Sequence, residues 1–280
     1  MTIATPDVHS RRPATGFVRP TVYLVWWNAG AAVLDAFMLR AERPPEEQPA
    51  ILVSYLQLRE WQRWQPRLPY RQWILDSGVF TARTQGREID VDAYADACLE
   101  LMETDPTLAE IISVDTGAYE EGNWRPTARN TERLWNRGVP AIPAFHFKEP
   151  WPVLEGYARE YPKVAIGGLV GLAEPIKVRY AKECFARVWP KPIHGLGVGG
   201  RKSIMAVPWH SVDSTNWSTS AQRHGNWVHY GRMSVRKWAG VTLDAEVQYF
   251  IDLEKLARFR WRREMATLEA HLEAWKGEAA

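Results

Sequence analysis

The chain has 280 residues, of which 46% are hydrophobic and 24% are charged, and its formal net charge at pH 7 is +2. This composition excludes a disordered, a collagen-like or a disulfide-framework protein, and the length is sufficient to bury a full hydrophobic core. No apolar run approaches the 18 residues of a transmembrane helix, and the start of the chain lacks the apolar centre of a signal peptide. We therefore expect a globular cytoplasmic protein with a flexible segment over residues 1–20.

Tryptophan and arginine are prominent in the composition. The chain has 15 Trp against 10 Tyr and 8 Phe, and only nine of its 35 basic residues are Lys. Trp and Arg are favoured at contact surfaces and stack on nucleic-acid bases, but core packing and genome composition explain the same counts. Cys98 and Cys184 lie in helix-like segments without a pairing or zinc motif, which suits a reducing compartment.

Short apolar runs alternate with amphipathic helical patterns along the chain. We predict strands over residues 23–27, 51–55, 73–76, 111–115, 141–146, 164–168, 193–197 and 211–213. We predict helices over residues 91–103, 128–137, 151–160 and 175–188, and two more within 244–276. Alternation of this kind is typical of βαβ units and a parallel sheet.

Eight such strands favour a (β/α)8 barrel of the TIM type over residues 21–243, with the C-terminal helices of residues 244–280 packed on it. A doubly wound open sheet is the alternative, because periodicity does not reveal whether a sheet closes.

Three of the predicted strands end in a carboxylate, at Asp76, Asp115 and Asp213. The carboxyl ends of the strands form the active-site face of such a barrel, so we expect these side chains to converge. Carboxylates gathered in this way can divide the roles of nucleophile, general base and hydrogen-bond acceptor. The alternative is that each Asp caps the helix that follows its strand.

Other strand ends carry histidines and glycines. Gly167 and Gly168 would let the backbone approach a planar ligand closely. His146 ends another strand, and His194 could bind a ligand or be a hydrogen-bonded core residue. The glycine-rich segment 195–200 lacks the spacing of a Walker loop, and no His/Glu pair has metal-ligand spacing. We therefore predict no cofactor and no catalytic metal.

The order of these motifs resembles that of the tRNA-guanine transglycosylase superfamily. The resemblance spans about residues 75–225 and rests on Asp76-Ser77-Gly78-Val79-Phe80, Asp115, Gly167-Gly168-Leu169, the segment 194–199 and Asp213. Ser-Val-Asp-Ser-Thr at 211–215 and Leu-Val-Ser-Tyr at 52–55 are most similar to the phage and bacterial branch that places 7-deazaguanines in DNA.

This resemblance implies a DNA guanine transglycosylase that replaces guanine with a 7-deazaguanine base in a bacterial or phage-infected cell. Asp213 would be the nucleophile that forms a covalent glycosyl intermediate, and Asp76 the general base toward the incoming base. Asp115 would accept hydrogen bonds from the base edge. The residues that the resemblance implies for base binding are Ser77, Asp115, His146, Gly167, Gly168, Leu169 and His194.

Two departures from the family pattern bear on the substrate. No cysteine follows Cys184, so the three-Cys, one-His zinc site of the tRNA enzymes is missing, which favours DNA over tRNA and predicts that there is no zinc subdomain. Glu174 is separated from Gly-Gly-Leu by additional residues. This displacement favours a neutral 7-cyano or unsubstituted base over an aminomethyl-bearing one.

The segment from residue 214 to 243 contains no acidic residue. Cations can neutralise phosphates while aromatic rings stack on bases, and this segment directly follows Asp213. The residues that we predict to bind nucleic acid are Trp217, Arg223, His224, Trp227, Arg232, Arg236 and Lys237. The alternative is a solvated basic surface over core tryptophans, which we prefer for a second cluster at residues 59–73. Base exchange in a duplex would require a flipped-out or single-stranded guanine.

Three other functions fit the same residues. They are a tRNA-guanine ribosyltransferase, a glycoside hydrolase in which water resolves the intermediate, and a non-catalytic nucleic-acid-binding subunit with a degenerate barrel site. The sequence leaves open whether the protein acts as a homodimer or with an accessory protein.

Overall fold

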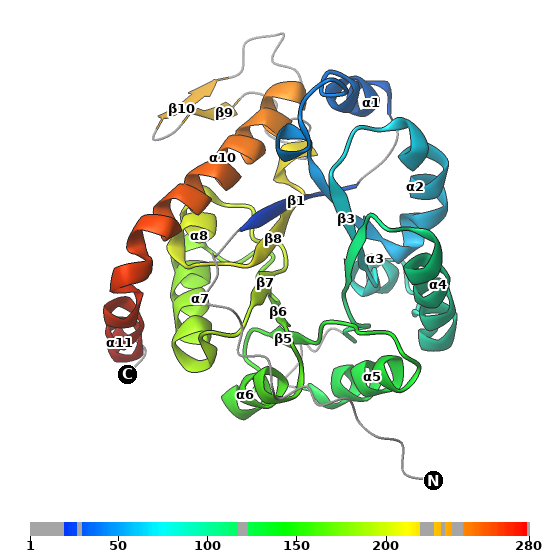
Figure 1. Ribbon diagram of the computed structural model, residues 1–280. Coiled ribbons are helices and arrows are strands. Elements are labelled where there is room, and N and C mark those ends of the chain that lie inside the picture. The colour runs from blue at the N-terminus through cyan, green and yellow to red at the C-terminus, as the bar shows by residue number, and fades with distance from the viewer. Residues whose placement is uncertain are drawn as a thin grey trace.

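The computed structural model describes residues 20–26, 30–116, 123–218, 227–230, 233–236 and 243–278. Its centre is an eight-stranded parallel sheet with the strand order β4-β3-β2-β1-β8-β7-β6-β5. The strands are β1 (Thr21–Val25), β2 (Ala50–Ser54), β3 (Gln72–Asp76), β4 (Leu108–Ile111), β5 (Ala144–His146), β6 (Val164–Gly167), β7 (Ile193–Gly195) and β8 (Ser211–Ser214). The sheet is curled, and helices lie around its outside (Figure 1).

The helices are α1 (Ala31–Met38), α2 (Leu58–Trp64), α3 (Val79–Thr84), α4 (Val91–Thr104), α5 (Arg125–Asn136), α6 (Trp151–Glu160), α7 (Glu174–Val188), α8 (Arg201–Ala206), α10 (Leu243–Glu264) and α11 (Leu268–Glu278). Short 3₁₀ turns cover Pro45–Glu47, Tyr55–Gln57, Gln65–Arg67 and Met265–Thr267. A separate antiparallel hairpin consists of β9 (Trp227–Tyr230) and β10 (Met233–Arg236).

All eight predicted strands are present, and the predicted helices correspond to α4, α5, α6, α7, α10 and α11. The prediction for β4 was shifted, since the strand covers Leu108–Ile111 and not residues 111–115. Every two strands that are neighbours in this order are also consecutive in the sequence, apart from β1 and β8. A doubly wound sheet is therefore excluded, and the architecture is consistent with a TIM-like barrel.

The two edge strands of the sheet, β4 and β5, approach each other. An isolated parallel bridge joins Ile112 to Ile142. The Ser113 N–H donates to the Ile142 carbonyl at 2.9 Å, and the Ile142 N–H donates to the Ile111 carbonyl at 2.8 Å. The residues that the structure describes contain no ladder between these two edges that is longer than this single bridge.

The register of the ladders places a set of polar residues on one face of the sheet. Tyr23 pairs with Asp213, and His194 pairs with Ser211. Asp76 pairs with Ser54, and Glu110 pairs with Ile74, two residues before Asp76 on the same strand. Because alternate residues of a strand share a face, these polar side chains all point to the inner side of the curled sheet.

The outer face of the sheet packs against the helices in one large apolar core. Six tryptophans are almost completely buried: Trp26, Trp61, Trp73, Trp209, Trp217 and Trp261. Trp61 and Trp73 belong to the second Arg/Trp cluster and are buried, as the preferred interpretation expects, whereas Trp64 of the same cluster is half-buried. Core packing thus accounts for much of the tryptophan content.

The C-terminal helix α10 is attached to the sheet by a buried carboxylate. Glu254 Oε2 accepts a hydrogen bond of 2.8 Å from the Val22 N–H of β1 and one from the Arg71 guanidinium. Glu254 Oε1 lies 2.6 Å from the guanidinium of Arg258. A separate ion pair joins Arg40 to Asp244 at the start of α10. These contacts fix the helix along the outside of the sheet (Figure 1).

None of the helices in the described ranges is both long enough and apolar enough to cross a bilayer.

Candidate active site

Two of the three predicted carboxylates lie on strands of the sheet, and the third follows β4. Asp76 is the last residue of β3, and Asp213 lies in β8. Burial raises the pKa of Asp76 most strongly, and the negative charges of Asp115 and Asp213 raise it further, to about 7. The Gly78 N–H opposes this shift by donating to Asp76 Oδ2 at 2.9 Å. Each of the other two carboxylates thus acts electrostatically on Asp76, so the three belong to one site.

The two oxygens of Asp213 are in different situations. Oδ1 accepts hydrogen bonds from the Gly197 N–H at 3.0 Å and from His194 Nε2 at 3.3 Å. Among the described residues, Oδ2 accepts none. The side chain is only 8% exposed, and the two donors hold it in one orientation with the lone pairs of Oδ2 available for reaction.

A chain of buried polar groups leads to Asp213 from the opposite end of the sheet. Lys163, directly before β6, donates to both carboxylate oxygens of Glu110 at 2.8 and 2.6 Å and to Ser211 Oγ at 2.8 Å. Ser211 Oγ lies 2.8 Å from His194 Nδ1. Because an ammonium can only donate, Ser211 accepts from Lys163 and its own proton goes to Nδ1 of His194. The remaining ring proton is therefore on Nε2, which donates it to Asp213.

The charges in this chain support that assignment. Burial raises the pKa of Glu110, but the hydrogen bond from His210 and the charge of Lys163 outweigh burial and lower it to about 2. Burial lowers the pKa of Lys163 to about 8 against the attraction of Glu110. Burial also lowers the pKa of His194. At neutral pH the chain therefore contains a neutral imidazole and a Lys–Glu ion pair whose ammonium is buried and whose carboxylate is half-buried.

Asp115 is held by a second group of polar side chains. Its Oδ1 accepts from Ser77 Oγ at 3.3 Å, and its Oδ2 lies 2.8 Å from His146 Nε2. On its other side, His146 Nδ1 lies 3.5 Å from Glu149 Oε1. Burial lowers the pKa of His146, but the hydrogen bonds to Asp115 and Glu149 outweigh it and raise the pKa to about 10. His146 is therefore a buried cation between two carboxylates.

Two glycines of the site are required by their surroundings. Gly78 has φ +76°, and a Cβ atom there would lie 2.3 Å from Ser54 Oγ. Gly168 has φ +71°, and its Cβ would lie 3.0 Å from the backbone nitrogen of Phe147. Only glycine adopts these conformations readily, so both turns bring backbone close to the strand ends.

The structure brings most of the predicted base-binding residues together around the carboxylates. Ser77 and His146 contact Asp115, and His194 contacts Asp213. Both histidines are almost completely buried, which makes them positioning residues for the carboxylates. The side chain of Leu169 is also buried, whereas Gly168 is partly exposed. Backbone contacts from Gly167, Gly168 and Leu169 to a base stay predictions.

The prediction of Trp217 as a nucleic-acid contact is wrong for this structure. Its side chain is fully buried, its Nε1 donates to the Val25 carbonyl at 3.0 Å, and its ring packs against Phe37. Arg223, His224, Arg232 and Lys237 lie outside the described residues. Trp227 and Arg236 lie in β9 and β10, for which the structure describes only the backbone.

Sequence reasoning missed the partners that hold the site residues in place. Glu149 lies only three residues after His146 and could have been noticed at that spacing. Glu110, Lys163 and Ser211 are far apart in the sequence, and only the strand register shows that they face one interior. Helix capping, the alternative for the carboxylates, does not explain Asp76, because the N-cap of α3 is Gly78 and has no side-chain cap.

Within the described ranges, no group of three or more His, Cys, Asp or Glu side chains is arranged to hold a metal ion.

No protein-family model and no curated protein matches the chain. Among solved structures, the chain is similar to the carboxyl transferase domain of Rhizobium etli pyruvate carboxylase, with a TM-score of 0.47 and 11% identity over 87% of this chain and 47% of that one. A second structure, of Rhizobium etli pyruvate carboxylase, gives a TM-score of 0.43 and 11% identity over 92% of this chain and 29% of that one. The chain thus spans less than half of either protein. Similarity at this level carries no argument about function.

Proposed function

We propose that the chain is a DNA guanine transglycosylase, built on a closed (β/α)8 barrel, that exchanges guanine for a 7-deazaguanine base. The observation that carries this proposal is the arrangement of Asp213, which has one oxygen fixed by two donors and the other without a hydrogen bond from any described residue. Its negative charge acts on Asp76, whose pKa burial and the neighbouring carboxylates raise to about 7. A fixed nucleophilic carboxylate next to a carboxyl group that can gain or lose a proton at neutral pH suits covalent glycosyl transfer.

The exchange would proceed in two balanced half-reactions. First, Asp213 Oδ2 forms a bond to C1′ of the deoxyribose while the C1′–N9 bond breaks. The electron pair of that bond leaves with guanine, which takes a proton from neutral Asp76. In the second half-reaction, the Asp76 carboxylate takes the N9 proton of the 7-deazaguanine, N9 bonds to C1′, and the Asp213–C1′ bond breaks with its electron pair returning to Asp213.

The surroundings of the carboxylates support a neutral guanine-like base. Asp115 is fixed by Ser77 and His146 and would accept hydrogen bonds from the base edge. Glu174 Oε1 accepts the Ser203 N–H of α8 at 2.8 Å, so this carboxylate is directed to the start of α8, in line with its displacement from the Gly-Gly-Leu segment. We therefore propose 7-cyano-7-deazaguanine as the incoming base.

Mass spectrometry tests the proposal directly. Purified protein incubated with a guanine-containing oligodeoxynucleotide and 7-cyano-7-deazaguanine is expected to yield the modified deoxynucleoside after enzymatic digestion. A parallel incubation with tRNA separates this activity from that of a tRNA ribosyltransferase. Incubation without added base separates it from a hydrolase, which would release guanine and leave abasic sites. The absence of modified deoxynucleoside from DNA would overturn the proposal.

The two half-reactions are expected to depend on pH in opposite directions. Because Asp76 must be neutral to protonate guanine, kcat/KM for DNA should fall as the pH rises through about 7. Because Asp76 must be ionised to deprotonate the incoming base, kcat/KM for that base should fall as the pH drops through about 7. The midpoint of this fall should lie slightly lower than for DNA, because Asp213 carries no charge in the intermediate and then no longer raises the pKa of Asp76. Initial rates measured across this pH range, first with DNA limiting and then with the incoming base limiting, check both pH dependences.

Substitution of Asp115 tests whether Asp76 is the group responsible for these two pH dependences. Asp115→Asn removes a negative charge that raises the pKa of Asp76, so the midpoints of both pH dependences should move to lower pH. Asp35→Asn, on the exposed surface of α1, should leave them in place. Unchanged midpoints in Asp115→Asn would contradict the assignment of this titration to Asp76.

A further inference from the structure

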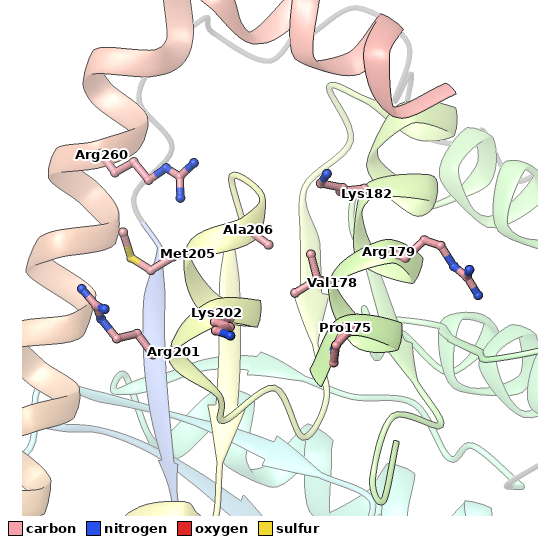
Figure 2. Close-up of a pocket in the computed structure, with 9 residues that line it drawn as sticks. All are labelled: Pro175, Val178, Arg179, Lys182, Arg201, Lys202, Met205, Ala206 and Arg260. Atoms are coloured by element: carbon pink, nitrogen blue, oxygen red, sulfur yellow. The ribbon is translucent and has the colours of Figure 1, made fainter. Parts of the chain in front are cut away.

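A second concave surface lies outside the sheet, between α7, α8 and α10. It is a groove of about 830 Å³ (Figure 2). Five cationic side chains line it: Arg179 and Lys182 from α7, Arg201 and Lys202 from α8, and Arg260 from α10. The rest of its lining is apolar and contains no carboxylate. We call this surface the basic groove.

The positive charge of the basic groove is only partly neutralised by its surroundings. Arg260 Nε lies 2.9 Å from Glu264, and Arg179 Nε lies 3.9 Å from Glu183. Among the described residues, neither Arg201 nor Lys202 pairs with a carboxylate. The groove therefore has a net positive charge and favours an anionic ligand.

The arrangement of the cations indicates an extended ligand. In Figure 2 the charged ends of Lys182, Arg201, Lys202 and Arg260 are spread around the groove and do not gather at one point, whereas the guanidinium of Arg179 points away from it. A single phosphate is best held by donors that converge on it, whereas a polyanion is bound by cations distributed along its path. The distribution in the basic groove fits the second case.

The basic groove is connected to the candidate active site through one short loop. Gly197, whose N–H holds Asp213 Oδ1, lies four residues before Arg201. Arg201 and Lys202 are the first two residues of α8. The start of α8 is fixed in turn by the hydrogen bond from the Ser203 N–H to Glu174. A strand bound in the groove would therefore run close to the loop that orients the nucleophile.

We propose that the basic groove binds the phosphodiester backbone of the nucleic-acid strand whose base enters the active site. This inference rests on the proposed polynucleotide substrate and adds the path of its backbone. It assigns binding to α7, α8 and α10, none of which was predicted from the sequence to contact nucleic acid.

Salt-dependent binding of a fluorescein-labelled single-stranded oligodeoxynucleotide tests the inference. In the Arg201→Gln/Lys202→Gln variant, the slope of log Kd against log salt concentration should fall by about 1.4, because each phosphate contact on a single strand contributes about 0.7. A second variant, Lys182→Gln/Arg260→Gln, removes cations from the other two helices and should give a similar drop. Circular dichroism and thermal melting verify that each variant is folded.

A matched pair of substitutions controls for the loss of net charge. Arg129→Gln/Arg159→Gln removes two exposed cations from α5 and α6, which do not line the basic groove, and should leave the slope unchanged. An unchanged slope in both groove variants would overturn the inference. So would competition by poly-glutamate as effective as competition by unlabelled oligonucleotide, because the groove would then recognise an acidic peptide.

Binding and base exchange separate this inference from the proposed function. Oligonucleotide binding that depends on the basic groove, without base exchange, would support the inference about the groove and contradict the proposed transglycosylase function. If the protein exchanges bases but its groove variants bind DNA like the wild type, the proposed transglycosylase function is supported and the inference about the groove is overturned.

Discussion

The Asp213→Asn variant is expected to lose base exchange by about 10⁴-fold or more, the size of effect seen when an essential catalytic group is removed. An amide cannot form the glycosyl ester that the proposed reaction requires. The fold should be retained, because the amide oxygen can still accept hydrogen bonds from Gly197 and His194 in place of Oδ1. Quantification of modified deoxynucleoside by mass spectrometry measures the loss.

A covalent adduct gives a second measurement of the same prediction. Wild-type protein incubated with DNA but no incoming base should form a protein–DNA complex that survives denaturing electrophoresis, whereas Asp213→Asn should form none. Asp35→Asn serves as the control, since Asp35 is an exposed residue of α1 and takes part in none of the contacts described for the site. Exchange at a wild-type rate in Asp213→Asn would refute its role as nucleophile.

The Lys163→Met variant is expected to lower the free energy of unfolding by about 3 kcal/mol, the lower end of the cost of breaking a buried ion pair. Lys163 is 7% exposed and donates to Glu110 and Ser211. Without the ammonium, the Glu110 carboxylate would keep His210, at 3.5 Å, as its one remaining ion-pair partner among the described residues. Urea denaturation followed by circular dichroism measures the change.

Removal of both charges separates the stability of the ion pair from its effect on catalysis. The double variant Lys163→Met/Glu110→Leu should recover most of the lost stability, because an apolar pair of similar volume pays no desolvation cost. Its base exchange should stay slower than that of the wild type, since Ser211 no longer has a donor that directs its proton to His194. Equal destabilisation in the single and double variants would contradict this account of the pair.

The fold was largely predictable because its signal is local. Each strand is a short apolar run followed by a turn, and α6 was predicted over the same residues, 151–160, that it occupies. The error at β4 has a physical cause: residues 111–115 are the more apolar stretch, but the ladder to β3 pairs Leu108 with Trp73 and Ile111 with Leu75. Pairing with a neighbouring strand set the boundary there, and hydrophobicity alone did not.

The site was predictable only in its strand-end carboxylates. Asp76, Asp115 and Asp213 end or follow apolar runs, which a sequence reveals directly. Lys163 directly precedes β6 and Glu110 lies in β4, two strands that are not adjacent in the sheet, and no spacing in the chain connects the two residues. Trp217 illustrates the opposite error, because an aromatic residue in a basic segment has a composition typical of nucleic-acid binding and yet packs in the core.

The buried Glu254 has a consequence for how the molecule unfolds. This carboxylate belongs to α10, but it receives hydrogen bonds from β1 and from Arg71, immediately before β3. If the helix detached alone, it would take with it a hydrogen-bond acceptor of the first strand and leave the half-buried Arg71 guanidinium without this partner. The sheet and the C-terminal helix should therefore melt in a single cooperative transition, and a truncation before residue 244 should yield aggregated protein in place of a smaller stable barrel.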